Sequence, residues 1–259
     1  MKLVVVDPKI VAKMDVIFTN LLHLTDIVSI RVGNTGLQIQ GTDQCKICMF
    51  DIKLHKELFS LYQIQDITVF TVSVRIFQKV LSTYKSDQTL ELFITNVDKL
   101  NMHLVGGKTT CDKLFQLPLI DMNDEVHHIS NEETDVEIYM TSKKFTELVS
   151  QLETFNNDLT FDLSEEHVNL KTEGEYGCMT AILSLDDMSL IDYSIIEDNN
   201  ICVSYNLKYI KIMSAFSKVS KEVKLEINQN KLLMMSYKLE SESMCKFILA
   251  SIIKETFSD

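Results

Sequence analysis

The sequence predicts an α+β fold in which amphipathic helices cover one face of antiparallel sheet. Three observations lead to this prediction. A helical segment followed by a β-hairpin occurs four times along the chain, the hairpins alternate apolar and polar residues, and each helical segment has one apolar face. Chance rarely reproduces one supersecondary pattern four times, so the repeat also suggests that function belongs to the assembled surface.

The predicted hairpins lie at residues 28–40, 90–104, 159–172 and 223–236. In each, a short polar turn such as GNTG or NQNK separates two alternating segments, which is the period of a half-buried antiparallel hairpin. If the hairpins join into sheets, the helices must cover the apolar face, or that face stays in contact with water.

The predicted helices span residues 8–22, 71–84, 142–155 and 206–218, and the first begins at Pro8, which suits a first helical position. Their expected buried positions are Ile10, Val11, Met14, Ile17, Phe18 and Leu21; Val72, Ile76, Phe77 and Val80; Phe145, Leu148, Val149, Leu152 and Phe155; and Leu207, Ile210, Met213 and Phe216. Asn20 is expected on the outward face of the first helix.

These helices carry nine basic residues, namely Lys9, Lys13, Arg75, Lys79, Lys143, Lys144, Lys208, Lys211 and Lys218. Against them stand only Asp15, Glu147 and Glu153, so the helices have a net charge of +6 in a chain whose net charge is −12. For a single helix, lysines on a solvated face would explain this. Basic residues on all four helices predict a segregated basic surface that attracts a polyanion without reading its sequence.

Composition indicates a globular chain long enough to bury a large core. Of 259 residues, 46% are hydrophobic and 24% charged, with two prolines and seven glycines, which leaves little room for linkers. The six cysteines are scattered, no segment has about 20 consecutive apolar residues, and no signal peptide is evident. We expect free thiols and an intracellular, non-secreted protein.

Four segments carry a family resemblance: GLQIQGTDQCKICMFDI (36–52), KL (113–114), TEGEYGCMTAIL (172–183) and LLMMSYKLESESMCKFILASI (232–252). In order and spacing they resemble the proliferating cell nuclear antigen family, the eukaryotic and archaeal DNA sliding clamps, over essentially the whole chain. Departures such as Gly41 and Gln44, where Asp and His are usual, mark a divergent member, from a virus or an early-branching eukaryote.

The resemblance implies two similar domains with two helix–hairpin repeats each: residues 1–117, a connector at 118–133, and 134–259. It also implies a ring of three subunits that encircles duplex DNA and tethers DNA polymerase and other clamp-binding proteins, opened by a clamp loader. Such a protein is a processivity factor in DNA replication and repair, not an enzyme, and has no cofactor. The expected location is the nucleus, or the replication compartment of a virus.

By the same resemblance, the nine basic helix residues named above would face DNA. The partner-binding pocket would consist of Gln40, Gln44, Cys45, Met122, Val126, Leu232, Ile248, Ala250 and Ile253. Leu232, Ile248 and Ile253 could instead be core residues. The subunit interface would pair a strand near residues 109–114 with one near 175–183 of a neighbour, through Thr110, Cys111, Glu175, Tyr176, Cys178 and Thr180.

Two other functions remain open: a subunit of a heterotrimeric checkpoint-type clamp, and an adaptor or transcription cofactor that keeps the fold without encircling DNA. Cys45 and Cys48 have the spacing of a metal-ligand pair, but no second pair follows, and on a strand they would point to opposite faces. His127 and His128 are expected in a solvated loop. No phosphate-binding glycine loop or nucleophile elbow occurs, so no metal or catalytic residue is predicted.

Overall fold

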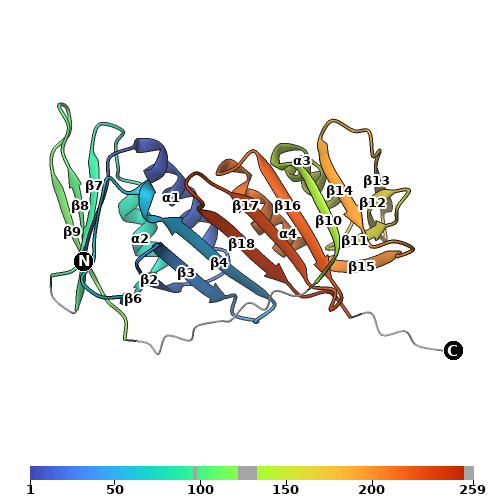
Figure 1. Cartoon of the computed structure of the whole chain (residues 1–259), viewed down its shortest axis with the longest axis horizontal. Helices are drawn as coiled ribbons and strands as arrows, with labels where there is room; N and C mark the ends of the chain where they lie inside the picture. The colour runs from blue at the N-terminus through green and yellow to red at the C-terminus, as the bar shows by residue number, and fades with distance from the viewer. Residues whose placement is uncertain (96–97, 122–132, 254–259) are drawn as a thin grey trace. The chain divides into compact units, whose positions relative to one another are not determined.

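The computed structural model describes residues 1–95, 98–121 and 133–253. These residues form two compact units (Figure 1). The first contains residues 1–121 together with 238–245, and the second contains residues 133–237 and 246–253. The predicted limits of the domains, 1–117 and 134–259, and of the connector, 118–133, stay a prediction, because residues 122–132 lie outside the described part of the chain.

The first unit has two helices, α1 (Pro8–Leu21) and α2 (Val74–Leu81), and a short 3-10 helix, η1 (Lys56–Leu58). One sheet has the order β5-β1-β7-β8-β9, and a second series of neighbouring strands runs β4-β3-β2-β6. Neighbouring strands in both pair antiparallel. The strands are β1 (Lys2–Val5), β2 (Ile27–Val32), β3 (Gly36–Thr42), β4 (Cys48–His55), β5 (Leu61–Gln63), β6 (Thr68–Ser73), β7 (Thr89–Phe93), β8 (Lys99–Val105) and β9 (Lys113–Pro118).

The second unit repeats this plan with α3 (Ser142–Leu152), α4 (Leu207–Ser214) and the 3-10 helix η2 (Ala215–Lys218). One sheet has the order β13-β12-β11-β15, and a second series runs β14-β10-β16-β17-β18. The strands are β10 (Thr134–Thr141), β11 (Asp158–Leu163), β12 (Val168–Gly174), β13 (Gly177–Leu183), β14 (Leu190–Ile195), β15 (Ile201–Asn206), β16 (Glu222–Asn228), β17 (Leu233–Lys238) and β18 (Met244–Leu249).

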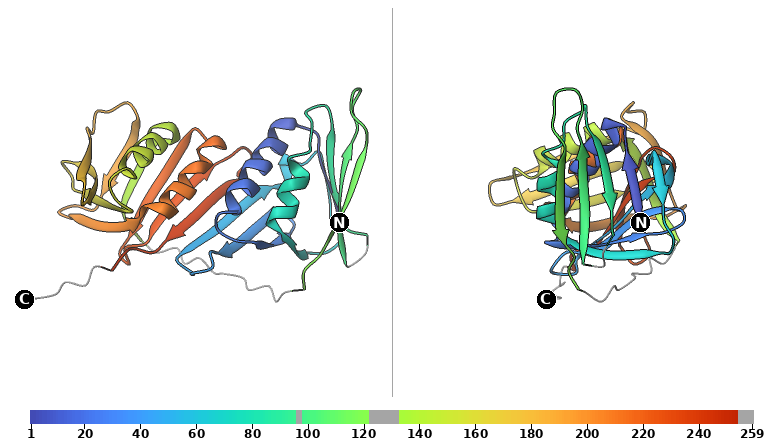
Figure 2. Two further views of the ribbon diagram at one scale, coloured as in Figure 1. Left: turned by 180° about the vertical axis from the view of Figure 1, so that it is seen from behind. Right: turned by 90° about the vertical axis from the view of Figure 1, so that its left-hand side faces the viewer.

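The predicted fourfold repeat is confirmed. Helices α1, α2, α3 and α4 are followed along the chain by the hairpins β2–β3, β7–β8, β11–β12 and β16–β17, respectively. In each unit the two helices lie side by side against one face of the sheets (Figure 2). The α+β fold class predicted from the alternation is therefore correct.

Each core is built between the paired helices and the sheets. In the first unit the rings of Phe18 on α1 and Phe77 on α2 stack with centroids 4.1 Å apart. In the second, Phe216 of η2 packs against Phe247, with centroids 4.6 Å apart, and against Tyr237. All five side chains are buried, so aromatic pairs join helix to helix and helix to sheet.

The predicted start of the second helix was wrong, and so was one of its buried positions. Residues 71–73 belong to β6, and α2 begins at Val74. Phe77 and Val80 are buried as predicted, and Val74 and Leu81 are buried beside them. Ile76, predicted to be buried, has 44% of its surface exposed. Apolar residues at every second position, Phe70, Val72, Val74 and Ile76, run across the end of β6 into the helix, and this hides the boundary from a periodicity argument.

The first helix also differs from the prediction at one position. Asn20 is buried, with its Nδ2 donating to the carbonyl of Val16 at 2.9 Å. The backbone supplies the partner that burial of an amide requires, so a polar residue can occupy an inward position.

The last two helices are shorter than predicted. Helix α3 ends at Leu152, and Phe155 is half-buried in the turn that follows. The segment predicted as one helix over 206–218 consists of α4 and then η2, with tighter 3-10 geometry at its end.

Candidate nucleic-acid interface

The outward side of α1 and α2 carries four of the predicted DNA-binding residues. Lys9, Arg75 and Lys79 are exposed, and Lys13 is half-buried. Asp7 caps α1 by accepting from the backbone N–H of Lys9 at 2.8 Å, so Lys9 lies in the first turn. Arg75 and Lys79, four residues apart, share one face of α2.

The outward side of α3, α4 and η2 carries the other five. Lys143, Lys208, Lys211 and Lys218 are exposed, and Lys144 is half-buried. Asn206 caps α4 with an acceptor for the N–H of Lys208, at 3.0 Å. In each unit, then, the structure brings the predicted basic residues to the paired helices.

Two of these lysines already have acidic partners. The Nζ of Lys13 lies 2.9 Å from Oε1 of Glu240, and the Nζ of Lys211 lies 2.8 and 2.7 Å from the two carboxylate oxygens of Glu153. Such exposed ion pairs stabilise little, but they lower the positive potential that an incoming phosphate meets. The basic surface is therefore weaker than a count of lysines indicates.

Each unit also ends one sheet in an edge strand that has a neighbour on one side only among the described residues. In the first unit this strand is β9, paired with β8, and in the second it is β13, paired with β12. Both carry large exposed apolar side chains, Leu114 on β9 and Ile182 on β13, with 57% and 75% of their surface exposed. Long edges of this kind are templates for pairing with another chain.

The six predicted interface residues lie at or beside these edges, but not all in strands. Thr110 and Cys111 precede β9, which begins only at Lys113, so the strand predicted near 109–114 was placed too early. The cause is Asp87, which holds this loop by accepting from the N–H and hydroxyl of Thr109 and from the hydroxyl of Thr110. These hydrogen bonds keep the pKa of the Asp87 carboxyl below its usual value.

On the other edge, Cys178 and Thr180 are exposed residues of β13 itself. Glu175 and Tyr176 form the turn between β12 and β13, with Tyr176 94% exposed. Gly177 closes this turn with φ of +139°, in the region that favours glycine. The turn therefore presents an aromatic ring beside a free edge.

The residues predicted for the partner pocket are divided between the two units. In the first, Gln40 is half-buried on β3, and Gln44 and Cys45 are exposed in the turn before β4. In the second, Leu232 and Ile248 are half-buried, whereas Ala250 and Ile253 are exposed. Ile253 is 89% exposed and is not a core residue. Met122 and Val126 lie outside the described residues.

Sequence reasoning missed the residue that organises the turn from 43 to 48. The buried carboxylate of Asp43 accepts from the N–H groups of Cys45, Ile47 and Cys48 at 2.7–2.9 Å. An Asp that opens a polar turn between two strands was the available signal, because its side chain can bond backbone groups that follow it.

Nothing in the described part of the chain forms a metal centre: it has no group of three or more His, Cys, Asp or Glu side chains placed to hold an ion. Cys48 is buried, and burial together with the charge of Asp43 raises the pKa of its thiol to about 12. It is therefore a protonated core residue, while Cys45 is exposed. His127 and His128 lie outside the described residues.

Comparison with known proteins identifies the family. A model of the proliferating cell nuclear antigen N-terminal domain matches residues 10–128, and one of the C-terminal domain matches residues 128–252. The chain belongs to the proliferating cell nuclear antigen family. The predicted resemblance is thereby confirmed, along with the two-domain clamp fold.

Relatives in this family include the DNA polymerase sliding clamps of Thermococcus gammatolerans and Pyrococcus abyssi. Each is 23% identical over 233 residues, covering 90% of this chain and 92% of the relative. Solved proliferating cell nuclear antigen structures from Sulfolobus tokodaii, a PCNA2–PCNA3 complex, and from Thermococcus kodakaraensis have the same fold. Both give a TM-score of 0.86 over 97% of this chain and 99% of theirs, at 21% and 20% identity. Among the described helices, none is long and apolar enough to cross a membrane.

Proposed function

We propose that this protein is a DNA sliding clamp, a ring that encircles duplex DNA and keeps a polymerase on its template. The observation that carries the proposal is the family match over residues 10–252 combined with outward basic residues on all four helices. Lysine and arginine on exposed helix faces attract phosphates without reading bases, as a protein that moves along DNA requires.

The ring would close through β9 of one subunit and β13 of the next. Both are edge strands in the described part of the chain, both expose apolar side chains, and they belong to different units. Contact between two different edges is heterologous, and such contacts close into a ring when the rotation between subunits is right. We propose a homotrimer, with these residues at or beside the subunit interface: Thr110, Cys111, Glu175, Tyr176, Cys178 and Thr180.

The proposed role requires no chemistry on a substrate. A polymerase bound to a threaded ring stays at high effective concentration near the primer end. Gln40, Gln44, Cys45, Leu232, Ile248, Ala250 and Ile253, with Met122 and Val126, are proposed to receive partner proteins. We infer that a clamp loader opens the ring and that the protein works where DNA is replicated, in the nucleus or a viral replication compartment.

The first test is light scattering of the purified protein over a concentration series. The expected mass is three times the 29.7 kDa of one chain. Leu114→Lys and Ile182→Lys should each reduce it toward one chain, since a buried unpaired charge opposes edge pairing. Ile67→Lys, on an exposed apolar residue before β6, is the matched control and should leave the trimer intact.

The second test is threading. With a clamp loader, the protein should remain on nicked circular plasmid and be released when a restriction enzyme linearises that plasmid. A monomer that binds only with other clamp-family chains would favour the heterotrimeric alternative. A monomer that neither threads nor stimulates a polymerase would favour the adaptor.

A further inference from the structure

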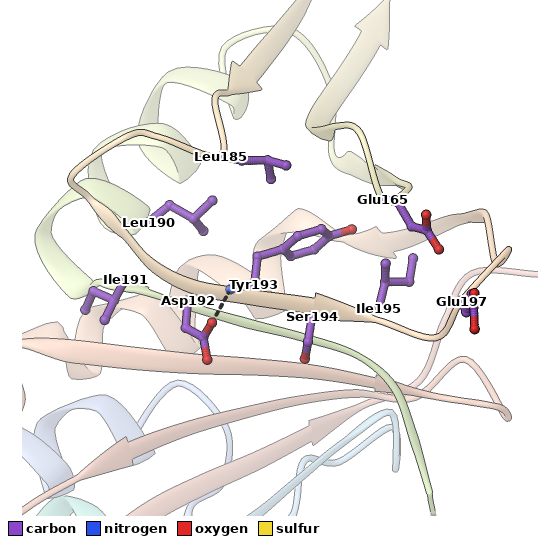
Figure 3. Close-up of a pocket in the computed structure, with 9 residues that line it drawn as sticks. All are labelled: Glu165, Leu185, Leu190, Ile191, Asp192, Tyr193, Ser194, Ile195 and Glu197. Carbon is purple, nitrogen blue, oxygen red and sulfur yellow. Dashed lines mark hydrogen bonds between the residues drawn. The ribbon is translucent and has the colours of Figure 1, made fainter.

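The second unit has another free edge, β14, which is separate from the strands proposed to close the ring. Among the residues that the structure describes, this strand is paired on one side only, with β10, and a groove of about 470 Å³ runs along it (Figure 3). We propose that the groove binds an extended peptide of alternating apolar and basic residues, which adds to β14 as a further antiparallel or parallel strand. Strand addition at a sheet edge is a general mode of peptide recognition.

The backbone of β14 is oriented for such pairing. The N–H of Ile196, which follows β14, donates to the carbonyl of Asp135 in β10 at 2.9 Å. Because alternate residues of a strand face opposite edges, Tyr193 and Ile195 direct their backbone groups away from β10. The N–H of Tyr193 accordingly donates to Oδ1 of Asp192, at 2.9 Å, rather than to the β10 ladder (Figure 3).

The groove has a preformed apolar wall. Leu190, Tyr193 and Ile195 lie opposite Met140, Ile138 and Val136 of β10, on the inner face of the sheet. Figure 3 shows Tyr193 and Ile195 on one side of the strand and Asp192 and Ser194 on the other, with Leu185 across the groove. The hydroxyl of Tyr193 donates to the carbonyl of Ser164 at 2.8 Å and fixes the ring. Alternate apolar side chains of an added strand would lie along this wall.

Charge selects a basic occupant. Glu165, Asp192 and Glu197 line the groove, and residues 184–199 contain five acidic residues without a lysine or arginine. A peptide carbonyl that accepts from the N–H of Tyr193 would release the Asp192 carboxylate toward a basic side chain. Since Asp192 lies on the opposite face from the apolar wall, the alternation of the peptide matches that of the strand.

The experiment measures fluorescence anisotropy of a short labelled peptide of alternating lysine and valine with the full-length protein. We expect saturable binding that weakens with salt, at least about fivefold weaker binding of a peptide with glutamate for lysine, and the same loss for a scrambled peptide of equal composition. Equal binding of all three peptides would overturn the proposal.

Two variants locate the site. Ile195→Pro removes an N–H at the free edge, a position where proline is tolerated, and should abolish binding. Glu197→Lys should weaken binding at least about fivefold, whereas Glu166→Lys, an exposed carboxylate in the same turn as Glu165 but outside the groove, should not. Unchanged binding to Glu197→Lys overturns the proposal even if Ile195→Pro fails to fold. A fall in the mass of the assembly with either variant would assign the groove to a second copy of the chain instead.

Discussion

A single buried carboxylate, that of Asp43, determines the conformation of the turn between β3 and β4. Its two oxygens accept from three backbone N–H groups, and the N–H of Cys48 is buried. The turn places Gln44 and Cys45, two of the proposed partner-binding residues, in solvent. The role of Asp43 is therefore to position a binding surface that it does not itself form.

Replacing Asp43 should destabilise the first unit strongly. Asp43→Ala leaves three N–H groups without their acceptor, and we expect the free energy of unfolding to fall by about 2–3 kcal/mol in urea denaturation. Asp66→Ala, at an exposed aspartate in the turn before β6, is the control and should change it by less than about 0.5 kcal/mol. Equal losses in the two variants would contradict the assigned role.

A second carboxylate, Asp162, links stability to pH. Hydrogen bonding to Lys171 is the main cause that holds the pKa of Asp162 below its usual value of 3.8, with a further bond to His167. A lowered folded-state pKa stabilises the protein above the unfolded pKa, and the effect is lost as the pH falls through the folded value. Lys171→Met should thus lower the free energy of unfolding at neutral pH, and this loss should vanish at pH values below the folded-state pKa of Asp162.

An NMR titration of the Asp162 carboxyl carbon should show its pKa rising toward 3.8 in Lys171→Met. Lys221→Met, at an exposed lysine before β16, should leave that titration unchanged. An unaltered pKa in Lys171→Met would show that another group sets it.

At the scale of elements, the phase of α2 decides which side chains hold the two helices of the first unit together. Phe77 stacks on Phe18, while Ile76 points to solvent. Phe77→Ala should lower the free energy of unfolding by about 3–5 kcal/mol, and Ile76→Ala by less than about 1 kcal/mol. Thermal unfolding of both variants checks this, and a larger loss for Ile76→Ala would mean that Ile76 is buried, as the periodicity predicted.

The elements also show how far sequence reasoning reaches here. The hairpins are correct because alternation has a period of two and a polar turn marks its reversal. Thr71 and Val72 were placed in a helix because the alternation of apolar residues in β6 continues into α2. The interface strand was predicted too early, at 109–114, because Asp87 holds the Thr109–Thr110 loop out of the sheet. Contacts distant in sequence, such as Lys13 with Glu240, leave no local pattern at all.

At the scale of the whole molecule, the segregation of charge governs the proposed attraction to DNA. The helices are basic while the chain carries a net charge of −12, so the negative charge lies on the rest of the protein. That remaining surface repels the polyanions that the helix faces attract. Lys79 and Lys208 are exposed, and in the described part of the chain no carboxylate lies within ion-pair distance of either.

Neutralising different lysines should therefore have unequal effects. Lys79→Ala with Lys208→Ala should shorten polymerase products and reduce the slope of log affinity for DNA against log salt by about 1–2, because each phosphate contact contributes about 0.9. Lys13→Ala with Lys211→Ala should reduce the slope less, since Glu240 and Glu153 already offset those charges. Equal reductions would mean that these ion pairs open fully on DNA.

The same two ion pairs bear on how a threaded ring would move. A lysine that exchanges its carboxylate for a phosphate gains little at any one position, so the energy along the duplex varies less from one phosphate to the next. Smaller variation means lower friction and faster one-dimensional diffusion. Glu153 and Glu240 would thus speed the diffusion of the ring along DNA. Removing these two carboxylates should slow that diffusion and raise the affinity of the ring for DNA.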